Sequence, residues 1–205
     1  METRSLAPDC LLTTVKGAVR ANAADFYALW DAQPEPHTTM GVQVLRRQLT
    51  YGQAYAFPGD GNRNTIPLLD APKLILECVR VAGIWAHELG YHDFVPNMAH
   101  TNWYPGGPAG LQRHQDSEQD LRKGAPIFSF TFLSPNTPPR IFRIATEKKG
   151  PALLDMKPKN GDLIVMHGKA FQKTLWHEVP KTCAKAALDG KRINVTVRQS
   201  HTHEL

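Results

Sequence analysis

The chain has 205 residues, the length of one domain, and its share of apolar (41%) and charged (21%) residues is ordinary for a globular protein. No apolar run approaches the ~18 residues of a membrane span, and Met1–Arg20 lacks the apolar core of a secretory signal. We therefore expect an intracellular protein, in cytoplasm or nucleus, with no membrane partner. Three separated cysteines indicate neither zinc nor disulfides, and a net charge of +5 favours a polyanionic partner.

The first ninety residues mix helical and irregular patterns. Residues 1–40 are interpreted as helical pieces and loops, with apolar residues at helical spacing over Ala18–Ala32. Val42–Leu49 alternates as a strand does, and Tyr51–Asn64 has the Gly, Pro and Asp content of a surface loop. Pro72–Leu89 is a second predicted helix with one apolar face.

From Asp93 onward, short apolar runs alternate with clusters of Gly, Pro and Asp, which is typical of an all-β sandwich or jelly roll. The predicted strands are Phe94–Asn102, Ile127–Leu133, Arg140–Ile144, Ala152–Met156, Asp162–Met166, Leu175–Val179 and Arg192–Arg198. The fold class expected is α+β, mainly β, with a jelly-roll core over residues 93–200 and N-terminal helices packed on one sheet.

One histidine of nine stands two residues before a carboxylate, in His114-Gln115-Asp116. In an extended segment these two side chains point to the same side and can reach one ion. His177, on a predicted strand of the same core, supplies the third ligand of the proposed site. Two histidines and one carboxylate on one face form the iron(II) site of non-haem oxygenases, so the spacing favours iron.

The segment Arg192–Arg198 alternates strictly, with Arg192, Asn194, Thr196 and Arg198 on one face of the predicted strand. Two arginines on an inward face are costly unless anions pair with them. A dicarboxylate cosubstrate and the iron-binding aspartate would provide these anions, and the planar guanidinium fork matches a carboxylate.

Five segments in a fixed order carry a family resemblance: Asn97–Tyr104; Pro105–Gly107 followed by His114–Glu118; Ala125–Phe130; Asn160–Met166 leading to His177; and Arg192–Arg198. Together they resemble the AlkB family of 2-oxoglutarate dioxygenases, over roughly residues 46–199. The resemblance implies a double-stranded β-helix that uses Fe(II), 2-oxoglutarate and O₂.

The family's roles carry over to matching positions. The resemblance implies that His114, Asp116 and His177 bind the iron. It also implies cosubstrate contacts: Arg192 and Tyr104 would hold the distal carboxylate of 2-oxoglutarate, and Asn102 and Asn194 would position the cosubstrate. Arg198 would lie beside the aspartate ligand and the keto-acid end of the cosubstrate.

The resemblance extends to a nucleotide-recognition lid with its supporting helix, over residues 41–92, after an N-terminal helical extension over residues 1–40. Arg46 and Arg47 would contact phosphates, Tyr55 and Phe57 would meet a flipped base, and Glu118 would contact the base edge.

The implied activity is oxidative dealkylation of N-methylated bases, of the 1-methyladenine and 3-methylcytosine type, in DNA or RNA. No duplex-wedging hairpin is recognisable in residues 36–47, which favours single-stranded substrates, and we expect a monomer. Two alternatives stay open. The chain could hydroxylate a protein side chain or a small molecule with the same iron centre, or it could bind nucleic acid without catalysis.

Overall fold

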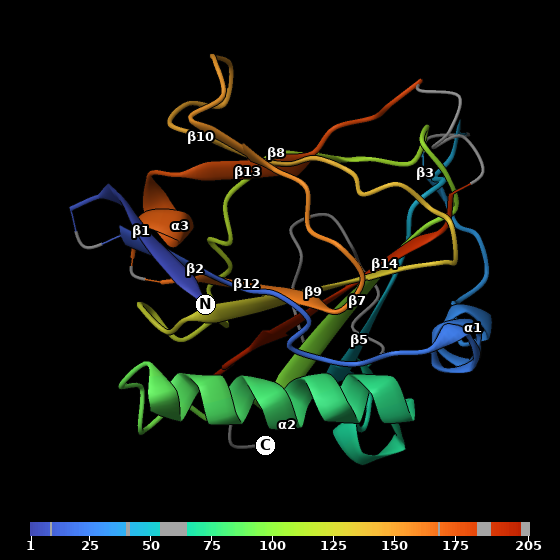
Figure 1. Ribbon diagram of the computed structural model, residues 1–205, viewed down its shortest axis with the longest axis horizontal. Coiled ribbons are helices and arrows are strands. Elements are labelled where there is room, and N and C mark those ends of the chain that lie inside the picture. The colour runs from blue at the N-terminus through green and yellow to red at the C-terminus, as the bar shows by residue number, and fades with distance from the viewer. Residues whose placement is uncertain (9, 40–41, 54–64, 168, 184–189, 202–205) are drawn as a thin grey trace.

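Two facing β-sheets and a helical layer make up the protein, which we describe from a computed structural model (Figure 1). The structure describes all residues except 9, 40–41, 54–64, 168, 184–189 and 202–205. None of the helices in these residues is long and apolar enough to cross a membrane.

The larger sheet contains eight strands, antiparallel except for the last pair. Their order from one edge to the other is β1 (Glu2–Ala7), β2 (Cys10–Val15), β12 (Asp162–Met166), β9 (Ile127–Leu133), β14 (Arg192–Arg198), β7 (Met98–Tyr104), β5 (Arg47–Gly52) and β6 (Thr65–Ile66). β9, β12 and β14 have the bounds that the sequence predicts, because a strictly alternating or apolar run bounded by turn residues marks both ends of a strand clearly.

The smaller sheet contains four antiparallel strands and faces the larger one. Its order is β11 (Leu154–Met156), β10 (Phe142–Ala145), β13 (Trp176–Val179) and β8 (Leu111–His114). An apolar cluster that includes Tyr104, Phe142 and Ile164 fills part of the space between the sheets. This arrangement is the expected jelly-roll core.

Helices cover the outer face of the larger sheet (Figure 1). They are α1 (Ala23–Asp31) and α2 (Lys73–Glu88). A 3-10 turn over Leu68–Asp70 and a short helix, α3 (Ala170–Lys173), lie elsewhere. A capping box between Asn22 and Asp25 starts α1. Ile193, Val195 and Val197 of β14 join the cluster that α1 and α2 bury, so the alternating polar residues of β14 face the smaller sheet.

One expectation for the N-terminal region is wrong. Residues 2–15 form the strands β1 and β2 rather than helical pieces, and β2 pairs with β12. β2 is buried at Cys10, Leu12, Thr13 and Val15 and exposed at Leu11, and the helical interpretation overlooked its β-branched residues, which favour a strand.

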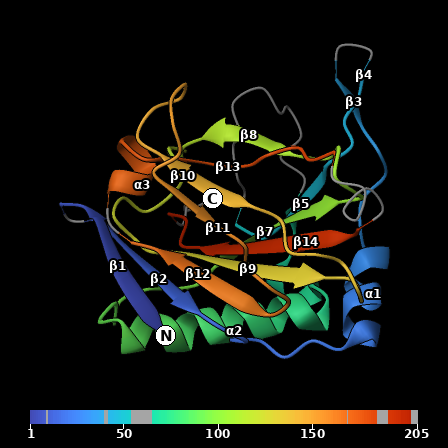
Figure 2. The ribbon, with the colours of Figure 1, turned by 45° about the horizontal axis from the view of Figure 1, so that its top comes forward.

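Two short paired strands occur within residues 36–47, where no duplex-wedging hairpin was recognised from the sequence. β3 (Thr38–Thr39) pairs with β4 (Val42–Gln43) and projects from the body of the protein (Figure 2). Strands of two residues give too short a pattern to be predicted. The preference for single-stranded substrates stays a prediction.

Candidate metal centre and cosubstrate pocket

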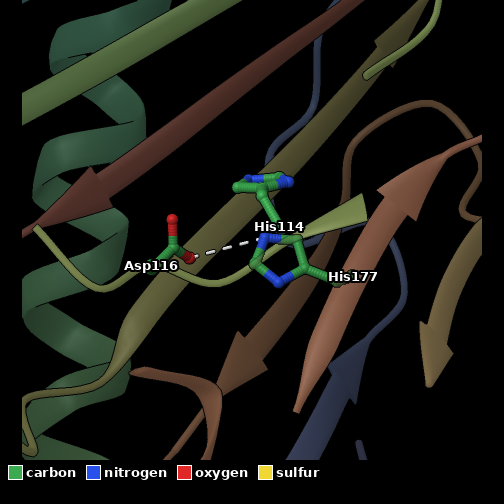
Figure 3. Close-up of side chains that lie close together, drawn as sticks. All are labelled: His114, Asp116 and His177. Carbon is green, nitrogen blue, oxygen red and sulfur yellow. Dashed lines mark ion pairs between the residues drawn. The ribbon is translucent and has the colours of Figure 1, made fainter. Parts of the chain in front are cut away.

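His114, Asp116 and His177 converge on one point between the two sheets (Figure 3). His114 ends β8 and lies directly opposite His177 of β13, with their ring centroids 4.2 Å apart. Asp116 follows two residues later. One potential ligand atom from each side chain lies within 4.8 Å of the others. The predicted triad is therefore assembled by strand pairing.

Asp116 is buried and held by a cation from the larger sheet. Arg198 donates a hydrogen bond to its Oδ1. Burial alone would raise the pKa of the carboxyl, but Arg198 and the nearby imidazoles outweigh burial and hold this pKa below its ordinary value. The other oxygen, Oδ2, has no hydrogen bond within the described residues and lies 3.5 Å from Nε2 of His177. This oxygen is available to a metal ion.

Both histidines can offer a ring nitrogen to a metal ion. Nδ1 of His114 lies 2.9 Å from the carbonyl oxygen of Gln112, which can only accept, so Nδ1 donates and the Nε2 lone pair is left for a metal. Burial lowers the pKa of His177 to about 3, with a further contribution from His114. Two imidazoles and one buried carboxylate fit iron(II).

Arg192 and Tyr104 lie opposite each other across the β14–β7 pair. Both are almost fully buried, and the guanidinium carbon of Arg192 is 4.9 Å from the centre of the Tyr104 ring. Arg192 donates to Thr131 Oγ1 (3.2 Å), while its Nε and Nη1 and the Tyr104 hydroxyl have no hydrogen bond to a described residue. Burial lowers the pKa of Arg192, and Tyr104 opposes this effect. Free buried donors of this kind suit a carboxylate ligand.

Asn194 and Asn102 form the next pair on the same face of these two strands. The Asn194 side chain is fixed because Nδ2 donates to Ser129 Oγ (2.9 Å) and to the Phe130 carbonyl (2.8 Å), and Oδ1 accepts from Thr196 (3.0 Å). Four of the five residues expected to bind the cosubstrate thus stand in two cross-strand pairs, and the fifth, Arg198, contacts Asp116.

A cavity connects the triad with Tyr104, Asn102 and Asn194 of the larger sheet, whereas Arg192 lies behind Tyr104 and is not among the residues that line it. Its lining comes from both sheets: Arg46, Gln48, His100, Asn102, Tyr104, Leu111, His114, Asp116, Ser129, Phe142, Met166, His177, Glu178, Val179, Asn194, Thr196 and Arg198.

Comparison with known proteins agrees with this chemistry. A family model described as the 2OG-Fe(II) oxygenase superfamily matches residues 27–198. The chain belongs to this superfamily. It is therefore a dioxygenase that uses Fe(II), 2-oxoglutarate and O₂. No curated protein matches the chain.

The fold is similar to a solved structure described as OsALKBH1, an AlkB homologue. That structure has a TM-score of 0.59 and 18% sequence identity, and the match covers 97% of this chain and 100% of the other. The AlkB-like fold expected from the sequence is confirmed.

The structure places the residues expected to bind substrate in different environments. Arg46 of the oxygenase lines the cavity, where Nη1 donates to Gln48 Oε1 (2.6 Å) and to Asn102. Arg47 turns away and contacts the Pro34 carbonyl (3.4 Å). Glu118 is partly buried and is not among the residues that line the cavity. Tyr55 and Phe57 lie outside the described residues.

Several cavity residues of the oxygenase were not predicted as site residues, among them His100, Gln48, Ser129 and Thr196. His100 is opposite Thr196 across the β7–β14 pair and shares a hydrogen bond of 2.9 Å with Thr50. The period of two on β7 places His100 on the same face as Asn102 and would have indicated it. Ser129 gives no comparable signal, since its role depends on the pairing of β9 with β14.

Proposed function

We propose that this oxygenase removes methyl groups from ring nitrogens of bases in DNA or RNA. The observation that carries the proposal is the path from the metal centre to the surface. The cavity shares Arg46, Leu111, Glu178 and Val179 with a groove of about 730 Å³. The groove is lined by residues 43–46, 108–112 and 178–181 and includes the cation of Lys181.

This path suits a base swung out of its strand. A base reaches an enclosed reactive centre only after it leaves the stack, while the attached phosphates stay outside and meet cations. Arg46 stands where cavity and groove join, the chain has a net charge of +5, and the hairpin of β3 and β4 leads into Gln43 at the groove. The likeness in fold to an AlkB homologue supports the same assignment.

Bound iron and 2-oxoglutarate would supply O₂ activation and the oxidation of a C–H bond. His114, Asp116 and His177 would bind the iron, and Arg198 would keep Asp116 ionised and oriented. Arg192 and Tyr104 would bind the distal carboxylate of the cosubstrate. Hydroxylation of an N-methyl group gives an N-hydroxymethyl group, which breaks down to formaldehyde and the unmodified base.

Formaldehyde release tests the proposal. The protein is incubated with Fe(II), 2-oxoglutarate and ascorbate, together with single- and double-stranded oligonucleotides that carry 1-methyladenine or 3-methylcytosine. We expect formaldehyde from the wild type and none from His177→Ala. Succinate formation without formaldehyde, under every condition, would contradict base dealkylation and move the search to protein side chains or small molecules.

A further inference from the structure

Arg140 is a buried arginine that the chemistry described above does not use. It lies in the segment between β9 and β10 and is 4% exposed. Its two terminal nitrogens donate to four backbone carbonyls: Nη1 to Gly106 (3.1 Å) and Ala109 (2.7 Å), and Nη2 to Gly107 (3.3 Å) and Pro180 (2.8 Å). No carboxylate forms an ion pair with it among the described residues.

The four carbonyls belong to two segments: the one that connects β7 to β8, and the one that follows β13. Residues 105–110 connect Tyr104, at the end of β7, to β8, which ends at His114. Pro180 follows β13, which carries His177. The two segments also touch directly, because a Cβ at Gly110 would lie 2.9 Å from the Val179 carbonyl oxygen. Arg140 therefore fastens the strand of Tyr104 to the strands of both histidine ligands.

Arg140 also contacts the side chain that is expected to meet the cosubstrate. Its guanidinium carbon is 5.6 Å from the centre of the Tyr104 ring, and that of Arg192 is 4.9 Å from the same centre. Burial, together with the charge of Arg192, lowers the pKa of Arg140 to about 10, so it stays protonated at neutral pH. Two buried cations thus share one ring, and neither has an acidic partner in the described part of the chain.

We propose that Arg140 is a positioning residue for 2-oxoglutarate, which holds Tyr104 and the 105–110 loop so that Tyr104 and Arg192 fit the distal carboxylate. This inference rests on the proposed roles of those two residues. The positive charge of Arg140 further favours an anion at this end of the cavity. Its effect is therefore directed at the distal carboxylate, rather than at the end of the cosubstrate that chelates the metal.

Arginine is the side chain that this position needs. A planar fork reaches four carbonyls on two segments at once, whereas a lysine ammonium is a compact point charge with three donors. Arg140→Lys keeps the charge and gives up the fork. Arg140→Met removes both and leaves the carbonyls without a side-chain donor. A role confined to stability would affect every ligand of the site alike, which makes the two roles distinguishable.

Calorimetry on the 205-residue chain loaded with Mn(II) measures ligand binding without turnover. The ligands are 2-oxoglutarate and oxalate, which chelates the metal but lacks the distal carboxylate. We expect Arg140→Lys to weaken 2-oxoglutarate binding roughly tenfold, as is common for residues that orient a ligand-binding group. Oxalate binding should change less than twofold. Equal weakening of both ligands, or of neither, would overturn the proposal.

Three further variants complete the test. Arg192→Met should weaken 2-oxoglutarate and spare oxalate; if it spares both, the assignment of the distal carboxylate fails and the Arg140 proposal falls with it. If only Arg192→Met has an effect, the Arg140 proposal alone is wrong.

Two variants are controls. Ile75 of α2 is buried against the outer face of the larger sheet, so Ile75→Val should lower the melting temperature without any contact with the site. Arg80→Lys repeats the exchange on exposed α2. Selective loss of 2-oxoglutarate binding in either control would also overturn it.

Discussion

Arg198 of β14 donates a hydrogen bond to Oδ1 of Asp116, and the other oxygen of this carboxylate is left on the side of His177. One side chain of the larger sheet thereby orients a ligand that belongs to the loop after β8. The metal centre is in this sense shared between the two sheets, because its histidines come from the smaller sheet and the residue that fixes its aspartate comes from the larger one.

This relationship predicts that Arg198→Met weakens iron binding. Without the cation, burial raises the pKa of the Asp116 carboxyl and favours its protonated form, which binds metal poorly. Loss of such a partner typically costs roughly 10- to 100-fold in metal affinity. Competition against a chromophoric chelator measures this affinity. Arg198→Lys, which retains the charge, should lose less, and wild-type affinity in Arg198→Met would contradict the assigned role.

A chain of alternating charges crosses all four strands of the smaller sheet. Asp155 of β11 pairs with Arg143 of β10 (2.7 Å), Arg143 lies 3.9 Å from Glu178 of β13, and Glu178 pairs with Arg113 of β8 (2.7 Å). Glu178 follows His177 and Arg113 precedes His114. Because the side chains of Arg113 and Glu178 are only 12% and 17% exposed, we expect Glu178→Gln to lower the free energy of unfolding by about 1–2 kcal/mol and to weaken metal binding.

Glu77→Gln on α2 is the matched control for this prediction. Glu77 pairs with Arg80 at 2.6 Å, but the side chains are 40% and 61% exposed. Exposed pairs contribute about 0–1 kcal/mol, so urea unfolding should show a smaller loss than in Glu178→Gln. Equal losses in the two variants would show that burial does not strengthen the cross-strand chain.

His167 predicts a pH dependence of stability. Its Nε2 shares a hydrogen bond of 2.8 Å with Thr13, its Nδ1 lies 3.2 Å from the Tyr91 hydroxyl, and burial lowers its pKa from 6.5 to about 4. The unfolded chain binds a proton more readily than the folded one, so this stability is present above pH 6.5 and is lost as the pH falls towards 4. The loss is at most roughly 3 kcal/mol.

Urea unfolding between pH 7 and pH 4.5 measures the effect in the wild type and in His167→Gln. Glutamine keeps a polar side chain but has no group that titrates in this range. The difference in unfolding free energy between the two proteins should therefore shrink as the pH is lowered. A difference that stays constant across the range would mean that the pKa of His167 is the same in the folded and in the unfolded chain.

Two glycines with positive φ offer a test of the packing between the front of the chain and β12. Gly161 (φ +79°) lies so close to Val19 that an added Cβ would be 2.1 Å from the Val19 carbonyl oxygen. A Cβ added at Gly17 (φ +58°) would have no atom within 4 Å. We expect Gly17→Ala to cost about 1–2 kcal/mol from backbone strain alone. Gly161→Ala should cost more, because strain and clash add. Similar melting temperatures for the two variants would contradict this close approach.

The sequence predicted the chemistry of the centre better than its surroundings. Local spacing was enough to identify His114, Asp116 and the alternating strand Arg192–Arg198, because the period of two of an extended chain determines which side chains share a face. Arg140 carries no such signal, because its partners are carbonyls of residues 106–109 and Pro180 that only the folded chain brings together. The same holds for Ser129, which reaches Asn194 through sheet pairing.

The errors have physical causes as well. β1 is an edge strand with exposed residues on both faces, so it shows no alternation, and its partner β2 was interpreted with it as part of a helical region. Arg46 and Arg47 are adjacent in sequence and were expected to act alike. Arg47 begins β5 and Arg46 lies in the bend before it, so that Arg46 lines the cavity and Arg47 contacts the Pro34 carbonyl.

The most direct test of the central claim is the visible charge-transfer absorption that develops when Fe(II) and 2-oxoglutarate bind together under anaerobic conditions. The claim is that His114, Asp116 and His177 bind iron beside a cosubstrate that reaches Arg192. We expect the absorption at one iron per chain in the wild type, its loss in His177→Ala, and a need for more 2-oxoglutarate in Arg192→Met. An undiminished absorption in His177→Ala would place the iron elsewhere and contradict the claim.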